Sequence, residues 1–292
     1  MDRLFQWLWD RYGPTYSWAL FATCYVVPFP IYLFLASTVV AFEHSDRYLV
    51  AAGATAIAMP ILAFGIVLPG IGPMRTVQRW AAGEKIDTAI ALEATYVWAR
   101  GAIARGVVAC AMCGAVSAVL AGIVAGADCL RILQYAILGA AVGAGTHLGG
   151  MHSVPETHMR PARIAIAGQT GIGDSLPRTH PTFVTWLNVG VLGVVFAFSV
   201  AGGALTGLFD QVSRTPVLLA VIGVVLTVLY GVPITVGSTF APSLAPIRDL
   251  AAATQRVAAG DYTKRLPVVQ DDDLGALAAS FNRMQAGLAE RQ

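Results

Sequence analysis

The sequence predicts an all-α fold: a polytopic membrane helix bundle of about six spans, followed by a polar module that forms a parallel coiled coil. Hydrophobic residues make up 56% of the chain and charged residues only 12%, against about 25% charge in an ordinary soluble domain. The few charges cluster and leave six long charge-free runs. After about residue 243 the chain becomes polar, and its apolar residues recur at helical spacing.

The charge-free runs are long enough to cross a bilayer. Each exceeds the roughly 20 residues that a helix needs to cross about 30 Å of hydrocarbon, and one charge at the centre of such a helix costs about 2.5–3.5 kcal/mol. The sequence therefore predicts a membrane domain over residues 17–242. Its six spans are expected near residues 17–41, 49–70, 106–126, 131–150, 184–208 and 216–240.

The distribution of Lys and Arg predicts the orientation. With six spans, both termini lie on one side, which would hold ten Lys and Arg residues before the C-terminal module, against three on the other side. By the positive-inside rule, both termini are expected in the cytoplasm of a cell that carries this protein in its plasma membrane. Residues 1–16 are then a cytoplasmic interfacial segment, because Trp7 and Trp9 suit the headgroup region.

The connections between spans differ in length. Residues 72–104 are expected to form an amphipathic helix and residues 151–183, which hold His, Pro and Gly, a less regular loop. The outer loops are tiny, near residues 43–48, 127–130 and 209–215, so no outer domain is expected. No charge lies in the middle of a span, which disfavours ion-coupled transport.

No active site, bound cofactor or metal centre is expected within the chain. His147, His152 and His158 with Glu156 suggest a metal site, but a polar loop is the favoured interpretation because the spacing of zinc helices is missing. The four cysteines are interpreted as packing residues. Pairs spaced as G-x-x-x-G, including Gly139 with Gly143, predict close helix packing, within the bundle or at a dimer seam.

The C-terminal module, residues 243–292, carries the most specific pattern. Leu250 and Val257 belong to one heptad seam, and Leu277, Phe281 and Met284 belong to a second one. Between the seams, Gly260-Asp261 and Pro267 interrupt the helix, which predicts helix, extended connector, helix. The three carboxylates Asp271, Asp272 and Asp273 are expected to cap the second helix.

This module resembles the HAMP domain. The residues that carry the resemblance, and to which we assign the relay role, are Pro246, Leu250, Gly260, Asp261, Leu266, Asp273, Gly275, Leu277, Phe281 and Met284. The family usually has Glu where Asp273 stands. The resemblance implies a parallel homodimeric four-helix coiled coil, in which Leu266 and Val268 of the connector pack along the outside.

The whole layout is similar to the membrane half of actinobacterial class III adenylate cyclases. Arg79-Trp80-Ala81 and Met159-Arg160-Pro161 resemble elements of that group's inner loops, although Met159 replaces the usual Leu. The resemblance implies that the chain senses a membrane-borne stimulus and passes it through HAMP to a downstream cyclase domain, outside this chain, that makes cAMP from ATP with Mg or Mn. The expected partners are a second copy, the lipid bilayer and a lipid-like ligand, and no nucleic acid.

Other functions fit parts of the pattern. The input half of a sensor histidine kinase is the main alternative, because it shares HAMP but needs a downstream phosphorylated His. A transporter and a stand-alone HAMP adaptor are weaker alternatives. The apolar seam still runs at the last residues, from which we expect a regulatory part of a longer protein or of a complex.

Overall fold

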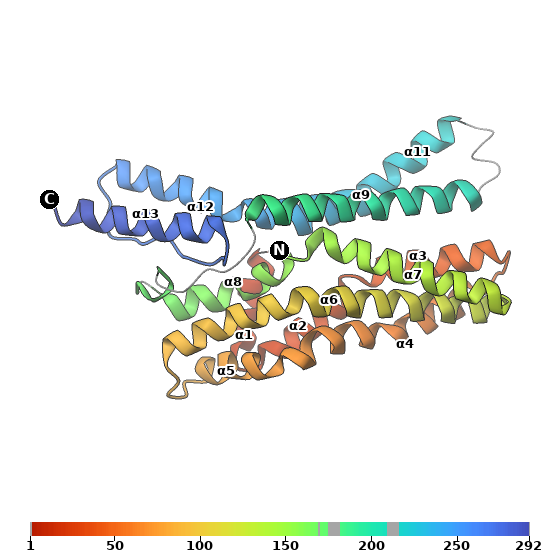
Figure 1. The fold of residues 1–292 in the computed structure, drawn as a ribbon, viewed down its shortest axis with the longest axis horizontal. Coiled ribbons are helices and arrows are strands. Elements are labelled where there is room, and N and C mark those ends of the chain that lie inside the picture. The colour runs from red at the N-terminus through yellow and green to blue at the C-terminus, as the bar shows by residue number, and fades with distance from the viewer. Residues whose placement is uncertain (1, 169, 175–181, 209–215, 292) are drawn as a thin grey trace.

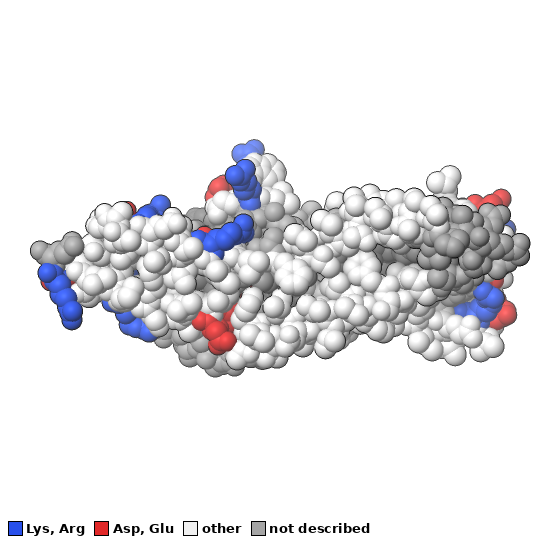
Figure 2. Space-filling view, turned by 90° about the horizontal axis from the view of Figure 1, so that it is seen from above, with Lys and Arg blue, Asp and Glu red and all other residues white. Residues whose placement is uncertain are grey.

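The computed structural model describes residues 2–168, 170–174, 182–208 and 216–291, and every regular element within them is helical. Figure 1 shows the membrane helices running side by side, with the last two helices, α12 and α13, projecting at one end of the bundle. Within these residues, six helices are long and apolar enough to cross a membrane. Lys, Arg, Asp and Glu gather toward the two ends of the molecule and leave an uncharged band between them (Figure 2). The fold class expected from the sequence is confirmed.

The first predicted span is broken in the middle. Helices α1 (Asp2–Tyr12) and α2 (Tyr16–Val26) are joined by the 3-10 turn η1 (Gly13–Thr15), and α3 (Phe29–Phe42) follows after a break at Pro28. The break forms because Pro28 and Pro30 have no N–H to donate to the preceding turn. The predicted interfacial segment is helical, and its face with Phe5 and Trp9 is buried in the bundle.

The third span is much longer than predicted. After α4 (Tyr48–Val67) and η2 (Leu68–Gly70), α5 (Ile71–Ala81) ends in a turn where Gly83 has a φ of +83°. Helix α6 then runs from Thr88 to Ala125, beginning where the Asp87 carboxylate accepts hydrogen bonds from the Ala89 and Ile90 amides at 2.7 and 3.3 Å. One continuous amphipathic helix over residues 72–104 was therefore a wrong prediction, since this capped turn divides it.

Helix α7 (Cys129–Gly150) packs tightly on α6 through glycine. A Cβ added at Gly143 would overlap the Cys110 carbonyl, and one at Gly139 would overlap the Gly114 carbonyl. The spacing of Gly139 and Gly143 thus serves packing within the bundle, one of the two alternatives that the sequence left open. At the end opposite α12 and α13, Arg131 pairs with Glu43 at 2.5 Å.

The less regular loop predicted over residues 151–183 is in part a helix. Helix α8 (Ser153–Ala167) packs Met159, Ala162 and Ile166 into the same core as Trp98 of α6. Burial of this face stabilises a helix that the local His, Pro and Gly content does not favour. The turn η3 (Ile172–Asp174) follows.

The last two spans pack loosely on the others. Helix α9 (Phe183–Leu208) is followed by α11 (Pro216–Leu226), then by the π-helical segments η4 (Thr227–Gly231) and η5 (Pro233–Phe240). Only 6% of the window Ala220–Gly237 is buried, against 44% of the window in α6. The sequence predicted a regular helix over 216–240, and the π-helical turns around Pro233, which lacks a donor, differ from it. The predicted loop 209–215 lies outside the described residues.

The C-terminal module continues directly from η5. Helices α12 (Ala241–Ala258) and α13 (Asp273–Ala289) are joined by an extended connector that begins at Gly260, whose φ is +84°. Leu250 and Val257 of α12 pack against a small core between the helices and the connector. The buried members of that core are Ala253, Leu266, Val268, Ala278, Ala279 and Phe281.

Candidate functional site at the junction of the two domains

The connector of the C-terminal module lies against α6 and α8 of the membrane domain. The Tyr96 hydroxyl donates to the Val268 carbonyl at 3.4 Å, and Arg163 Nη1 donates to the Val269 carbonyl at 2.5 Å. Val268, Val269 and Gln270 are all buried. The connector is therefore packed on both sides, against its own helices and against the membrane domain.

Arg163 is the centre of this junction. Its side chain is fully buried and pairs with Glu156 two turns earlier on α8, with Nη1–Oε2 at 2.5 Å and Nη2–Oε1 at 3.2 Å. Its Nε donates to Thr95 Oγ1 at 3.0 Å, and its guanidinium lies 3.9 Å from the centre of the Tyr96 ring. Burial alone would lower the pKa of Arg163, but the Glu156 carboxylate raises it, so the guanidinium stays charged.

The start of α13 is also held by the membrane domain. Asp272 is the N-cap residue: its Oδ1 accepts from the Leu274 and Gly275 amides at 2.9 and 3.2 Å. The other oxygen, Oδ2, lies 3.3 Å from His152 Nε2, and the His152 ring stacks on Trp186 of α9 at 5.0 Å between centroids. Capping was expected of the three aspartates, and Asp272 provides it.

The neighbouring aspartates have other positions. Asp271 is buried and pairs with Arg100 of α6 at 3.5 Å, and Arg100 also pairs with Glu93 at 2.6 Å. Asp273 is the exposed first residue of α13. Carboxylates of adjacent residues thus link the HAMP connector to α6 and to the residue that precedes α8.

Three further contacts tie the module to the bundle. Arg160 of α8 pairs with Asp249 of α12. Asp174 of η3 pairs with Arg265 of the connector and accepts from Asn282 Nδ2 of α13 at 3.3 Å. Asn282 also bonds both backbone groups of Leu266 at 2.9 Å, so it fixes the connector to α13.

The turn between α12 and the connector is fixed locally. The Asp261 carboxylate accepts from the Thr263 amide at 3.0 Å and from its hydroxyl at 2.7 Å. These hydrogen bonds hold the pKa of Asp261 below its usual range. Gly260 supplies the left-handed backbone conformation that this turn requires.

The predicted relay residues fall into two groups. Leu266, Gly275 and Phe281 are buried within the module, and Pro246 and Leu250 are partly buried on α12. Leu277 and Met284 are exposed, and with Ile247 and Leu288 they leave an apolar surface on α12 and α13. We call these four residues the open seam.

Sequence reasoning did not single out the residues that hold the junction together. In the sequence, Arg163 counts only as a positive charge that predicts orientation, Glu156 stands among the suspected metal ligands, and Thr95 and Tyr96 belong to no recognised motif. The available signal was weak, because Glu156 and Arg163 lie seven residues apart, two full turns on one helix face. Their contacts to Thr95 and Val269 span 68 and 106 residues of sequence.

The suspected metal ligands do not come together. Within the described residues, no group of three or more His, Cys, Asp and Glu side chains could hold a metal ion. His147 lies in α7, His152 contacts Asp272, and His158 is buried against Phe5 with ring centroids 4.5 Å apart. His152 and His158 are thus buried residues at the start and inside of α8, which corrects the expectation of a polar loop.

Comparisons with known proteins find relatives among signal transduction histidine-protein kinases. A stretch of 49 residues is 41% identical to the signal transduction histidine-protein kinase BaeS of Escherichia coli (strain K12), covering 17% of this chain and 10% of that protein. A stretch of 101 residues is 32% identical to the signal transduction histidine-protein kinase/phosphatase MprB of Mycolicibacterium smegmatis, covering 33% of this chain and 20% of that protein. The chain thus spans a fifth or less of the length of these two relatives. No solved structure matches the chain.

A protein-family match falls on the C-terminal module. Residues 241–290 match the HAMP domain family, which covers α12, the connector and α13. The chain is therefore a multi-pass membrane region joined to a HAMP signal-relay domain, and its relatives in these comparisons are sensor kinases rather than adenylate cyclases.

Proposed function

We propose that this chain is the membrane-embedded input and relay region of a signalling protein. The single observation that carries the proposal is the buried contact of Arg163 with Glu156, Thr95 and the Val269 carbonyl, which makes the HAMP connector part of the packed membrane domain. A shift of α6 or α8 must then displace the connector or break buried polar contacts. A stimulus needs only a few kcal/mol of preference for one arrangement to move such an equilibrium.

The orientation and the assembly follow from charge and from the open seam. The module and both termini face the cytoplasm of a plasma-membrane protein, because the positive-inside rule places the Arg-rich end there. The open seam, Ile247, Leu277, Met284 and Leu288, is covered by a second copy of the chain in a parallel homodimer. Because the outer connections are short, the stimulus comes from within the bilayer.

Two outputs downstream of HAMP are supported by different observations. The relatives found by comparison favour a histidine kinase, the output for which BaeS and MprB are named. The layout of six spans with Arg79-Trp80-Ala81 and Met159-Arg160-Pro161 favours an adenylate cyclase, which would use ATP with Mg or Mn outside this chain. Of the two, the kinase has the support of measured similarity, although that similarity covers at most a third of the chain.

A charge exchange across the junction tests the relay. Arg160 and Asp249 form an ion pair between α8 and α12. We expect Arg160→Asp or Asp249→Arg alone to lock or abolish regulated output, and the double exchange to restore regulation, because it re-forms the pair with reversed signs. The output is measured in membranes that contain the polypeptide from its own gene, as autophosphorylation and as cAMP formation. Unchanged regulation in both single variants would contradict the relay, and the activity that is found decides between kinase and cyclase.

A further inference from the structure

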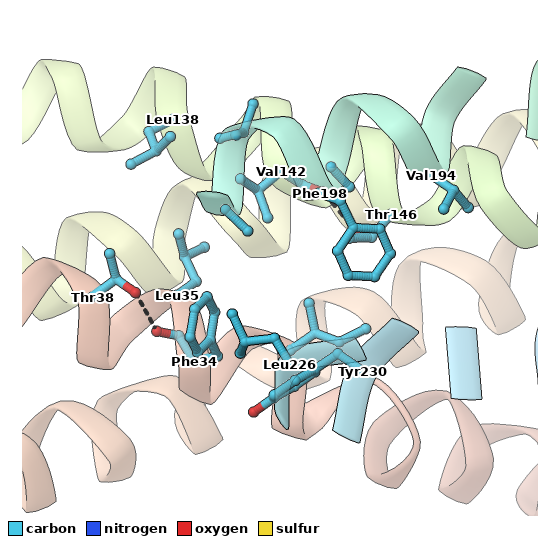
Figure 3. Close-up of a pocket in the computed structure, with 14 residues that line it drawn as sticks. Phe34, Leu35, Thr38, Leu138, Val142, Thr146, Val194, Phe198, Leu226 and Tyr230 are labelled. Atoms are coloured by element: carbon cyan, nitrogen blue, oxygen red, sulfur yellow. Dashed lines mark hydrogen bonds between the residues drawn. The ribbon is translucent and has the colours of Figure 1, made fainter. Parts of the chain in front are cut away.

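Two neighbouring cavities in the membrane bundle have linings that join. The larger has a volume of about 440 Å³ and lies among α1, α2, α3, α4, α6, α7, α8 and η4, toward the HAMP end. The smaller has a volume of about 70 Å³ and lies among α3, α7, α9 and α11 (Figure 3). Ile31, Thr146 and Tyr230 line both cavities. Together they form one elongated site, which we call the bundle cavity.

The bundle cavity has the length and surface of an acyl-chain site. Its lining on α7 runs from Leu138 to Gly150, about 18 Å at 1.5 Å per residue, slightly more than one leaflet of a hydrocarbon core about 30 Å thick. Figure 3 shows Phe34, Leu35 and Val142 around its smaller part, where almost all lining atoms are carbon. A membrane-embedded cavity of this kind is filled most readily by a hydrocarbon chain.

The HAMP end of the cavity is polar but uncharged. His158 and His147 line it, and only 6% of the His158 surface is exposed. The buried His147 Nε2 has no hydrogen-bond partner among the described residues. The indole Nε1 of Trp98, whose ring lies 6.3 Å from that of His158, also lacks an acceptor among the described residues. Burial lowers the pKa of His158 to about 4, so its ring is neutral at pH 7. Among the described residues that line the two cavities, none is Lys, Arg, Asp or Glu.

We propose that the bundle cavity binds one single-chain amphiphile with an uncharged, hydroxyl-bearing head group, of the monoacylglycerol type. The head group lies beside His158, Trp98 and His147. There a hydroxyl satisfies Trp98 Nε1 and His147 Nε2, which are buried without a partner among the described residues. The acyl chain runs along α7 past Thr146 and Tyr230. A charged head group is disfavoured because no opposite charge is available in the cavity to offset its desolvation. This inference names the class of ligand for the proposed sensing role, and it rests on that proposed function.

The position of the cavity explains how occupancy reaches the HAMP domain. Tyr230 and Leu226 line the smaller part, and they belong to the loosely packed last span that continues through η5 into α12. The Tyr230 ring lies 5.5 Å from that of Phe34 on α3. A chain between α3, α7 and Tyr230 therefore sets the distance of the last span from the tightly packed helices.

Binding to the purified chain tests the inference without any output domain. Delipidated protein in detergent is titrated with 1-monooleoylglycerol, and bound molecules are counted by native mass spectrometry. Thr146→Phe places a ring where the two cavities meet. The hydroxyl that it removes donates to carbonyls of α7 itself in the wild-type protein, so no contact between helices is lost. His158→Phe removes the ring nitrogens but keeps a ring. Val108→Phe, on an exposed position of α6, is the matched control.

We expect one molecule per chain, with binding about tenfold weaker in Thr146→Phe and His158→Phe and unchanged in Val108→Phe. Oleate at pH 8 should bind about tenfold more weakly than the monoacylglycerol. Equal binding by all variants, no binding, or tighter binding of oleate would overturn the inference. Failure of the binding experiment would not contradict the relay, which the charge exchange at Arg160 and Asp249 tests separately. Failure of the charge exchange would likewise not change the binding result.

Discussion

Arg163 is fully buried in this protein, and its charge is balanced mainly by the Glu156 carboxylate, with a smaller contribution from Asp271. Removing one partner of such a pair leaves the other as an uncompensated buried charge, which costs about 3–5 kcal/mol. The pair is therefore strongly coupled, and the same side chain also supports the HAMP connector through the Val269 carbonyl. At the residue scale, this one guanidinium connects α6, α8 and the connector through Thr95, Glu156 and Val269.

We expect Arg163→Met to lower the free energy of unfolding by about 3–5 kcal/mol, because it leaves Glu156 buried without its partner. Arg163→Met combined with Glu156→Gln should recover a large part of that loss, since neither position then carries a buried charge. Chemical unfolding in detergent measures Arg163→Met, Glu156→Gln and the double variant. If the double variant is as unstable as the sum of the two single variants, the two residues are not coupled.

His158 predicts a pH dependence of stability. Burial lowers its pKa from 6.5 to about 4. Between these pH values His158 is therefore protonated in the unfolded chain and neutral in the folded chain. The contribution of His158 to the free energy of unfolding is therefore fully present above pH about 6.5 and is lost as the pH falls toward 4.

Between pH 7.5 and 5, this loss amounts to about 2 kcal/mol for the ligand-free wild-type protein. Over the same pH interval, the free energy of unfolding of His158→Phe should fall by about 2 kcal/mol less than that of the wild-type protein. The other titrating groups are the same in both proteins, so this difference reports His158 alone. An identical pH dependence in both proteins would show that His158 titrates normally.

At the scale of the elements, the residue that caps helix α13 also contacts the membrane domain. Asp272 caps the helix with one carboxylate oxygen and contacts His152 with the other. The adjacent Asp273 is exposed and contributes only its charge near the helix start. The two aspartates are a natural pair for comparison.

Asp272→Ala should destabilise the HAMP domain by about 1–2 kcal/mol, because the first-turn amides lose their acceptor. Asp273→Ala should cost a few tenths of a kcal/mol at most. Amide hydrogen exchange at Leu274 and Gly275 measures the effect where it arises. Equal exchange rates in the two variants would refute the assignment of Asp272 as the cap.

The elements differ in how far the sequence predicts them. The spans follow from length and hydropathy alone, because a bilayer demands both. The start of α6 and the whole of α8 were missed, since they depend on a cap at Asp87 and on burial of Met159 and Ile166, which only the folded chain supplies. The HAMP seams were visible because heptad spacing is local, whereas the contact of Arg163 with Val269 joins residues 106 positions apart.

At the scale of the whole molecule, the open seam is an apolar surface on the HAMP domain, and its exposure to water is unfavourable. Ile247, Leu277, Met284 and Leu288 are all exposed in the single chain. The last span is mostly unburied as well, so both parts of the C-terminal half have surface to share with a second copy.

A cysteine at Met284 should form a covalent dimer on mild oxidation in native membranes, because a parallel coiled coil brings this seam position close to its copy. Cys129 is exposed and is first replaced by Ser, while the buried Cys24, Cys110 and Cys113 are kept. Ala286→Cys, exposed on the other side of α13, is the matched control and should stay monomeric on denaturing gels. Equal cross-linking at both positions would argue against this seam.

Helix α6 is a rod of 38 residues, about 57 Å long, while the hydrocarbon core is about 30 Å thick. One end lies within the spans, and the other carries Thr95, Tyr96 and Arg100 under the HAMP connector. A lever of that length moves its tip by about 1 Å for each degree of tilt. A tilt of two or three degrees thus exceeds the tolerance of a hydrogen bond, so this helix converts a small change of angle in the bilayer into a choice between made and broken contacts at the relay.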